Sequence, residues 1–402
     1  MSNELLEQSQ QLLPQAIDLR RRIHQQPELG NYTPHTRSAV LAAIDDLDLD
    51  IRLSETTSGI VATLNGADDG PTLLIRGDMD ALPMPEDTGL EYASRSQGCM
   101  HACGHDAHTA MLAMAARLLS QNKKRLHGKV KFMFQPGEES PGGAKPMLNE
   151  GIVEYNGAPD AAFAIHIYPN LPAGVIATRP GPLMAGADIV KVRIAGKGGH
   201  ASMPYDANDP VPVACELVQA MQTFVTRRVK TFDPVVLTVA QINAGTVSNV
   251  IPEHVDLSAT LRTFTTESQQ LAHDGIHRLV ENIAAAHDMR GEISIEAGYP
   301  PTLNDSKFVG FVGETIKATF GEQCFISMPE PVMASEDFSL VLQRYPGAMA
   351  FLGVAPEGTD PQQAAPCHSN RMLLNENAMA IGVALHAAVA CEFLNGSSHR
   401  LN

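Results

Sequence analysis

The apolar residues of this chain fall into short continuous runs that alternate with longer amphipathic segments. Four of these runs predict buried strands, at residues 72–76, 129–134, 161–167 and 348–354. Segments with a 3.6-residue apolar period predict helices, at residues 4–25, 106–121, 305–319 and 375–394. Strands that alternate with helices are typical of a mostly parallel sheet with helices on its faces. We therefore expect an α/β fold for these parts of the chain.

The pattern changes between residues 187 and 297. Strand-like segments occur at 187–195, 234–242, 254–264 and 290–299, and helix-like segments occur at 209–229 and 266–288. Their order, β-α-β-β-α-β, is that of a ferredoxin-like α+β unit. A chain of 402 residues also exceeds the roughly 250–300 residues at which a single core stops growing. We expect a small domain at 187–297 inserted into a larger discontinuous domain formed by 1–186 and 298–402.

Composition narrows the range of partners and compartments. Lys and Arg total 29 against 45 Asp and Glu, a formal net charge of −16, which disfavours nucleic acid and anionic membrane surfaces as partners. No run approaches the ~20 uninterrupted apolar residues of a membrane span, so no membrane partner is expected. The N-terminus lacks the basic and apolar regions of a secretory signal, and the six cysteines are dispersed. These features favour a cytoplasmic protein with free thiols.

The segment HACGHDAH carries the most specific candidate chemistry. Cys103 and His105 are two residues apart, and thiolate and imidazole are side chains that hold zinc or manganese. An isolated pair of this kind is more often a buried thiol beside a histidine that caps a helix. Four other segments with potential ligands favour the metal interpretation here. His101 and His108 are interpreted as structural, with His108 packing on the helix.

Further candidate ligands follow the predicted strands. Glu138 and Glu139 come after 129–134, where one can bind a metal while the other takes a proton from water as general base. His166 lies inside the strand at 161–167, and His368 lies in a loop beyond 348–354. Taken alone, each of these residues also fits an ordinary alternative: solvated turn glutamates, a core histidine and a loop histidine.

Asp78 and Asp80, in RGDMDALP, follow directly after the strand at 72–76. Asp80 can orient a ligand histidine or tune a reacting water from behind the metal ligands. The alternative for this pair of carboxylates is a capped turn before Pro83.

Six segments, in this order along the chain, carry a family resemblance: RGDMDALP, HACGHDAHTAML, FQPGEE, GGHASMP, GTVSNVIPE and ASEDFS. Together they resemble the metal-dependent amidohydrolases that include hippurate hydrolases, N-acyl-amino-acid deacylases and plant auxin-conjugate hydrolases, relatives of aminoacylase and of carboxypeptidases with the same two-domain plan. The match runs from about Arg21 to about Asn375.

The resemblance implies a site, a substrate class and a partner. The implied metal ligands are Cys103, which bridges, with His105, Glu139, His166 and His368. Glu138 is implied as the general base, and His200 as a donor that helps to hold the tetrahedral oxyanion. The inserted domain is implied to act as a lid and to form a homodimer, in which His200 reaches the partner subunit's active site. Asn249 and Arg262 are implied to bind the substrate carboxylate or the oxyanion.

Two divalent cations per subunit are therefore expected, Mn or Zn first, with Co and Ni also suited to this mixed ligand set. The expected substrate is an N-acyl amino acid, whose amide bond is hydrolysed to a carboxylic acid and a free amino acid. A dipeptidase or carboxypeptidase with the same site is the alternative within enzymes. A catalytically silent dimeric binding protein is the alternative outside them, although the complete ligand set argues against it. A structural zinc protein fits poorly, because its ligands are usually closely spaced and these span residues 103 to 368.

Overall fold

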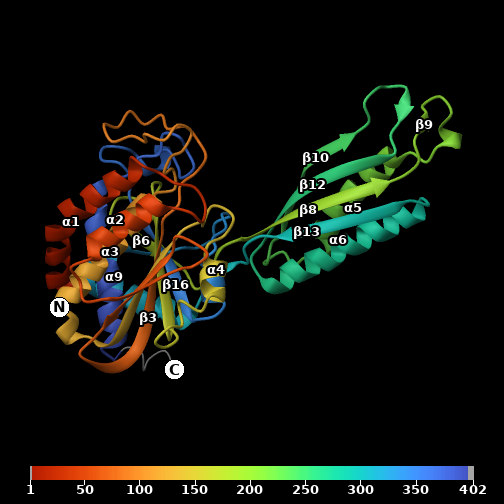
Figure 1. Cartoon of the computed structure of the whole chain (residues 1–402). Coiled ribbons are helices and arrows are strands. Elements are labelled where there is room, and N and C mark those ends of the chain that lie inside the picture. Colours follow the sequence, from red (N-terminus) through yellow and green to blue (C-terminus); the bar gives the residue numbers. More distant parts are fainter. Residues whose placement is uncertain (1, 397–402) are drawn as a thin grey trace. The chain divides into compact units, whose positions relative to one another are not determined.

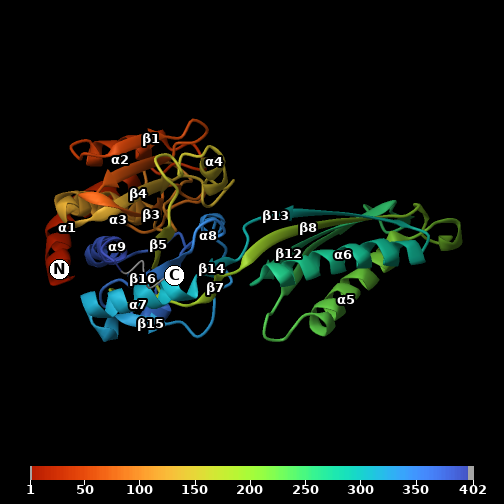
Figure 2. The ribbon, with the colours of Figure 1, turned by 90° about the horizontal axis from the view of Figure 1, so that it is seen from below.

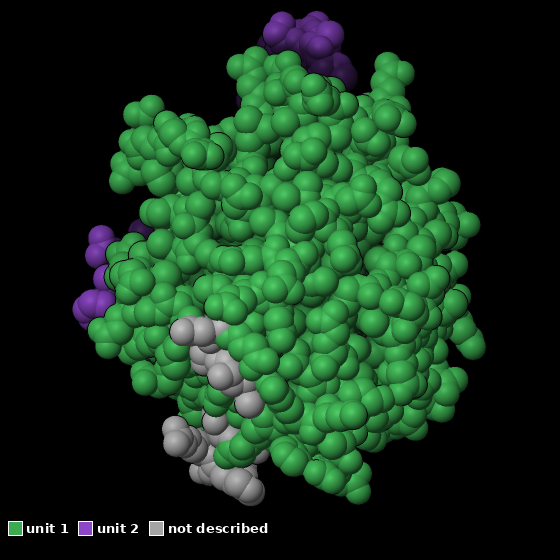
Figure 3. Space-filling model, turned by 90° about the vertical axis from the view of Figure 1, so that its left-hand side faces the viewer, with its two compact units in different colours: residues 1–183, 303–330, 340–402 green, residues 184–302, 331–339 purple. Residues whose placement is uncertain are grey.

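The computed structural model describes residues 2–396, which divide into two compact units (Figures 1 and 3). The first unit comprises the chain up to Leu183, residues 303–330 and the chain from Leu340 onward. The second unit comprises Met184–Thr302 and Pro331–Ser339. The segment expected to form an inserted domain, 187–297, lies within the second unit.

The helices, in chain order, are α1 (Ser2–His24), α2 (Pro34–Ile44), α3 (His105–Gln121), α4 (Ala144–Asn149), α5 (Pro210–Arg228), α6 (Thr266–Ala286), α7 (Ser306–Phe320), α8 (Ser339–Leu342) and α9 (Met379–Leu394). The strands are β1 (Asp50–Leu53), β2 (Ile60–Asn65), β3 (Asp68–Asp78), β4 (His127–Gln135), β5 (Ala161–Tyr168), β6 (Ile176–Thr178), β7 (Gly181–Met184), β8 (Gly186–Ala195), β9 (Gly199–His200), β10 (Val236–Ala244), β11 (Val250–Ile251), β12 (His254–Thr263), β13 (Arg290–Ala297), β14 (Thr302–Asn304), β15 (Phe325–Ser327) and β16 (Gly347–Gly353).

The first unit is built on an eight-stranded sheet with the strand order β1-β2-β4-β3-β5-β16-β6-β15. The four central strands β4, β3, β5 and β16 pair in parallel, whereas β1, β2 and β4 pair antiparallel to one another. The predicted α/β class with a mostly parallel sheet is confirmed. The antiparallel edge formed by β1 and β2, and the helix α2, were not predicted.

Burial explains why the central strands form continuous apolar runs. Every residue of β3 from Leu73 to Asp78 is buried, as is every residue of β16, because helices cover the sheet. Helix α3 packs on β3, and α1 and α9 pack on α3, so these three helices lie together beside the sheet (Figure 1).

Helix α9 and the turn before it qualify a prediction about membranes. The segment Glu376–Leu394 is long and apolar enough to cross a membrane by length and composition, contrary to the expectation that no segment would be. However, 83% of its most apolar 18-residue stretch is buried inside the protein. Its apolar character is therefore that of a core helix.

The second unit has the ferredoxin-like order. Its strands β8, β10, β12 and β13 form an antiparallel sheet in the spatial order β10-β12-β8-β13, and helices α5 and α6 pack against it (Figure 2). Residues along β8 and β12 alternate between buried and accessible positions, so only one face of the sheet belongs to the core. The ribbon formed by β9 and β11 extends this unit.

Candidate metal centre

The parallel strands of the first unit bring the predicted ligands to one edge of the sheet. Because β3, β4 and β5 run in the same direction, the residues at their carboxyl ends gather together. Asp78 is the last residue of β3, Glu138 follows β4 by three positions, and His166 lies near the end of β5. This edge of an open α/β sheet is where ligand sites are usually found.

A glycine sets the turn that presents Cys103 and His105. Gly104 has φ +81° and precedes the first residue of α3. A Cβ at this position would lie 2.5 Å from the Ile167 Cγ1 atom, so a larger residue would collide with β5. The turn therefore needs glycine both for its left-handed backbone and for its close approach to β5.

The structure brings all six predicted ligand and base residues of the first unit into overlapping groups. Within each group the potential ligand atoms lie within 4.8 Å of one another: Cys103 with His105 and His166; Cys103 with Glu139 and His368; and His105 with Glu138 and Glu139. Cys103, His105 and Glu139 each belong to two groups. Shared ligands of this kind suit two neighbouring cations better than one.

His105 provides the test of whether these residues fit a metal. Both of its ring nitrogens are buried and form no hydrogen bond within the part of the chain that the structure describes. The nearest carboxylate oxygens are those of Asp80, 3.4 Å from Nδ1, and Asp78, 3.6 Å from Nε2. A buried imidazole without hydrogen bonds is costly, and a bound cation would satisfy it. The donor set and this unsatisfied ring therefore fit a metal.

Local charges show how a cation would replace protons. Burial alone would lower the pKa of His105, but Asp78 and Asp80 raise that pKa well above its ordinary value. Contact with the Cys367 thiol, together with burial, raises the pKa of Cys103 well above its ordinary value. Metal binding to these two residues would therefore release protons.

His166 is held in one tautomer. Its Nδ1 lies 2.7 Å from the Ile167 carbonyl oxygen and donates a hydrogen bond to it, which leaves Nε2 as the free lone pair. Nε2 lies 3.4 Å from the Cys103 sulfur. Burial lowers the pKa of His166 well below its ordinary value, so the ring is neutral, as a ligand must be.

Asp80 organises the loop that carries the two glutamates. Its carboxylate oxygens accept hydrogen bonds from the backbone N–H groups of Glu138, at 2.9 Å, and Glu139, at 3.0 Å. The loop starts at Gly137, whose φ is +74° and whose Cβ would lie 2.0 Å from the Asn31 side chain. In this arrangement Asp80 fixes the backbone of the glutamates and faces His105.

His368 has an unusual backbone. It adopts φ +68°, a left-handed conformation that is uncommon for a residue other than glycine, and its N–H donates to the Ala102 carbonyl at 2.9 Å. Its Nε2 lies 3.0 Å from Glu139 Oε1. Such conformations often occur at functional sites. The left-handed backbone of His368 could not be recognised from the sequence.

The predicted oxyanion donor His200 and the predicted substrate-binding residues Asn249 and Arg262 lie in the second unit. His200 and Asn249 are exposed at the β9–β11 ribbon, where the Ala201 N–H donates to the Asn249 carbonyl at 3.1 Å. The Ser202 N–H donates to Nδ1 of His200 at 3.1 Å, so the neutral ring carries its proton on Nε2 and can donate from there. Arg262 is half-buried and donates to the Thr260 hydroxyl and the Leu261 carbonyl.

His108 and Asp78 contribute more to this centre than the sequence indicated. His108 is buried, as predicted, but its Nδ1 lies 2.6 Å from Asp78 Oδ1 and both side chains lie beside His105. The spacing of His105 and His108 on α3, three residues apart, places them on one face of the helix and was the available signal. The partner Asp78 lies thirty residues away, and no local pattern links the two.

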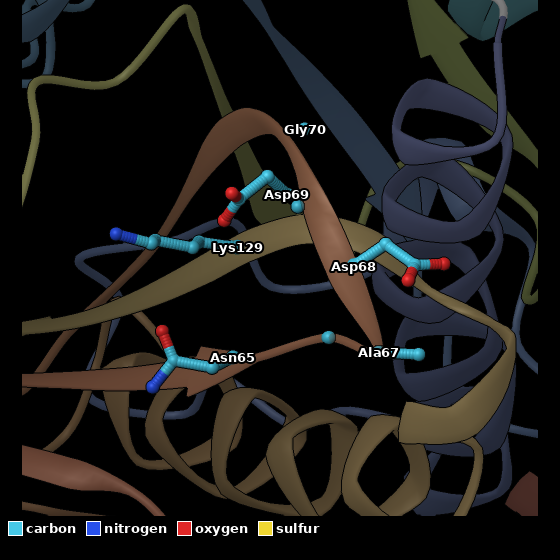
Figure 4. Close-up of a pocket in the computed structure, with 8 residues that line it drawn as sticks. Asn65, Ala67, Asp68, Asp69, Gly70 and Lys129 are labelled. Atoms are coloured by element: carbon cyan, nitrogen blue, oxygen red, sulfur yellow. The ribbon is translucent and has the colours of Figure 1, made fainter.

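A separate pocket of about 340 Å³ lies at the other end of the same strands (Figure 4). It is lined by residues 65–70 with Gly128 and Lys129, at the amino ends of β3 and β4. The pocket is separated from Asp78 by most of β3, on the order of 30 Å at ~3.3 Å per residue. It is therefore not part of the candidate metal centre.

Comparisons with known proteins agree with this fold. Residues 74–392 match the model of Peptidase family M20/M25/M40. The chain is 38% identical to an N-acetyl-L-cysteine deacetylase of Bacillus subtilis, over 84% of this chain and 80% of that protein. It is 35% identical to thermostable carboxypeptidase 1 of Saccharolobus solfataricus, over 94% and 95% of the two chains.

Among solved structures, the chain is similar to the YXEP protein of Bacillus subtilis, described as a dinuclear metal-binding peptidase of family M20. The TM-score is 0.83 at 32% identity, over 95% of this chain and 98% of that one. Fold and family together define a hydrolase with a mostly parallel α/β catalytic unit and an inserted α+β unit. The chain belongs to Peptidase family M20/M25/M40.

Proposed function

We propose that the protein is a metal-dependent amidohydrolase that hydrolyses the amide bond of N-acyl amino acids, releasing a carboxylic acid and a free amino acid. The observation that carries this proposal is the convergence of Cys103, His105, Glu138, Glu139, His166 and His368 at one edge of the sheet. The similarity to the Bacillus deacetylase, whose name describes an N-acyl amino acid substrate, supports the substrate class.

The proposed cation-binding residues are Cys103, His105, Glu139, His166 and His368, which would hold two divalent cations, Mn or Zn first, with Co or Ni as alternatives. The description of the similar Bacillus structure as dinuclear supports the number two. When bound, such ions lower the pKa of a water molecule and polarise an acyl oxygen.

The proposed reaction then needs only a proton carrier and hydrogen-bond donors from the chain. Glu138 takes a proton from water as the water oxygen attacks the acyl carbon. Glu138 delivers that proton to the amide nitrogen as the C–N bond breaks, so the carboxylate is regenerated. The His200 Nε2–H, contributed by the partner subunit, donates to the oxyanion, and Asn249 and Arg262 bind the substrate carboxylate.

The contrast between the two sheet edges of the second unit supports the proposed homodimer. Strand β13 carries Arg290, Glu292 and Glu296, charges that discourage strands from pairing with this edge. Strand β10, at the other edge, reads VLTVAQINA and has no charged residue; its Val236 and Ile242 are exposed. An uncharged, apolar edge strand favours pairing with a second copy of itself. The unpaired cysteines support the proposed cytoplasmic location.

A second candidate function is hydrolysis of dipeptides or of peptide carboxyl ends, which the similarity to a thermostable carboxypeptidase favours. Release of free amine from benzoyl-glycine, N-acetyl amino acids, indole-acetyl conjugates and dipeptides distinguishes the two. Chelator-stripped protein is compared with protein given Mn or Zn. Metal-dependent cleavage of the acyl conjugates alone supports the amidohydrolase, and cleavage of dipeptides supports the peptidase. No cleavage with either metal would contradict both and leave the silent dimeric binding protein.

A further inference from the structure

Ile167 lies beyond the end of the β3–β5 ladder, although β5 still pairs with β16 on its other side. The register between β3 and β5 runs from Leu73–Ala161 to Arg76–Ala164 and stops there. Three residues further along β5, the Ile167 N–H donates at 2.8 Å to a side chain, His108 Nε2. A histidine ring on α3 thus takes the place of a strand carbonyl, because a buried N–H needs an acceptor.

This hydrogen bond fixes the tautomer of His108. Since the Ile167 N–H donates to Nε2, that nitrogen carries no proton and the proton is on Nδ1. Nδ1 donates to Asp78 Oδ1 at 2.6 Å. The Asp78 carboxylate is in turn paired with the guanidinium of Arg76. Both nitrogens of His108 are therefore engaged, so His108 does not serve as a metal ligand in this arrangement.

The carbonyl of Ile167 fixes the neighbouring ligand. It accepts the hydrogen bond from His166 Nδ1, at 2.7 Å, that leaves His166 Nε2 facing Cys103. The rings of His108 and His166 are also in edge contact, with centroids 4.6 Å apart. The backbone of Ile167 thus links two histidines. Its N–H donates to His108, and its C=O accepts from His166.

We infer that Asp78, His108 and the backbone of Ile167 form a relay that fixes the position and tautomer of His166, and that His108 is a positioning residue for the metal centre. The inference rests on the proposed function, because that proposal makes His166 a metal ligand. Residues that hydrogen-bond to a metal ligand in this way typically change metal affinity by about 10–100-fold.

Two amide substitutions separate the two halves of the relay. In H108N the amide N–H can replace Nδ1 and donate to Asp78, but the acceptor for Ile167 is lost. In H108Q the longer side chain can place its oxygen near the Nε2 position and accept from Ile167. We expect H108N to bind Co²⁺ about 10–100-fold more weakly than the wild type and to change the visible spectrum of bound Co²⁺. H108Q should lie closer to the wild type in both respects.

His386 provides the matched control. It is 1% exposed, like His108, and belongs to the same unit, but it is hydrogen-bonded to none of the proposed ligands among the described residues. H386Q should bind Co²⁺ with wild-type affinity and spectrum. If H108N binds Co²⁺ like the wild type, or if H108Q and H108N lose affinity equally, the inference is overturned. Wild-type protein that binds no Co²⁺ would instead overturn the proposed metal centre itself.

A measurement on the unaltered protein covers the case in which H108N fails to fold. In ¹⁵N-histidine NMR of the metal-free protein, His108 should appear as a neutral ring protonated at Nδ1, with H108Q used to assign its signals. The amide of Ile167 should exchange slowly with solvent. A His108 ring protonated at Nε2 would contradict the relay directly.

Discussion

The two units of this protein carry candidate site residues in opposite physical states. In the first unit, His105 is fully buried and His166 is 8% exposed, and their surroundings were shaped by hydrogen bonds and charges before any ligand arrives. In the second unit, His200 and Asn249 are exposed at the β9–β11 ribbon. The first set is preorganised by its own unit, whereas the second set is open to solvent.

This difference separates two demands on a catalyst. Groups that hold a cation need fixed distances, which buried elements such as β3, β5 and α3 provide. Groups that bind substrate need access. The proposed dimer would supply the missing surroundings of His200 from the partner subunit, and the uncharged edge of β10 gives it a place to form.

The largest effect is expected in the first unit, at Glu138. E138Q removes the proton acceptor but keeps the size of the side chain, so turnover should fall by about 10²–10⁴-fold or more while metal content stays unchanged. Metal analysis and amine release measured on the same sample check this. E139Q is the matched neighbour and should instead lower metal content. Wild-type turnover in E138Q would remove Glu138 from the mechanism.

In the second unit, H200A should lower kcat by about 10²–10³-fold, the usual effect of removing one oxyanion donor. Because His200 belongs to no ligand group, metal content and the melting temperature should match the wild type. S202A, which removes only the hydroxyl next to Nδ1, is the control and should cost far less. A loss of bound metal in H200A would contradict the separation between the two units.

The edge of β10 tests whether the second unit needs a partner. I242K places a charge on this exposed edge and should shift the protein toward monomer in light scattering. Turnover per chain should fall with dilution as the dimer dissociates, by about 10-fold or more where monomer predominates. S294E, which places a charge opposite Lys191 on the already charged edge strand β13, should leave both unchanged. Full activity in a monomeric variant would show that the partner's His200 is not needed.

The smallest effect concerns stability and belongs to the first unit. Burial alone would lower the pKa of His24, but Asp106 and Glu86 raise this pKa from 6.5 to about 9. The stabilisation is therefore fully present below about pH 6.5 and is lost as pH rises through 9, with an upper limit of roughly 3 kcal/mol. Metal-free protein should lose stability in urea between these pH values, and H24Q should flatten that slope. H35Q, which removes an exposed imidazole, should keep the slope; a slope unchanged in H24Q would contradict the assignment.

Much of the fold was predictable because burial leaves a simple trace in sequence. The strand expected at 72–76 is the buried part of β3, and the helix expected at 106–121 is α3 within one residue. Helix α2 and strands β1 and β2 were missed. Strand β1 is only partly buried and has no clear apolar run. Strand β2 is buried from Ile60 to Leu64, but its apolar run is short and follows the polar segment SETTSG.

The candidate site was predictable where chemistry is local and unpredictable where it is long-range. Cys103 and His105, or Glu138 and Glu139, are recognisable as neighbouring residues with ligand chemistry. Nothing near His108 indicates that its partners are Asp78 and the backbone of Ile167, which only the sheet brings together. The left-handed backbone of His368 depends in the same way on its contact with Ala102.

The central claim is that the buried groups around Cys103 and His105 form a two-metal hydrolytic centre. The most direct test is a titration of chelator-stripped protein with Mn²⁺ or Zn²⁺, in which bound metal and amine release from an N-acyl amino acid are followed in the same sample. We expect metal binding to release protons and turnover to saturate at two ions per chain. Turnover that persists in the stripped protein, or that saturates at one ion, would contradict it.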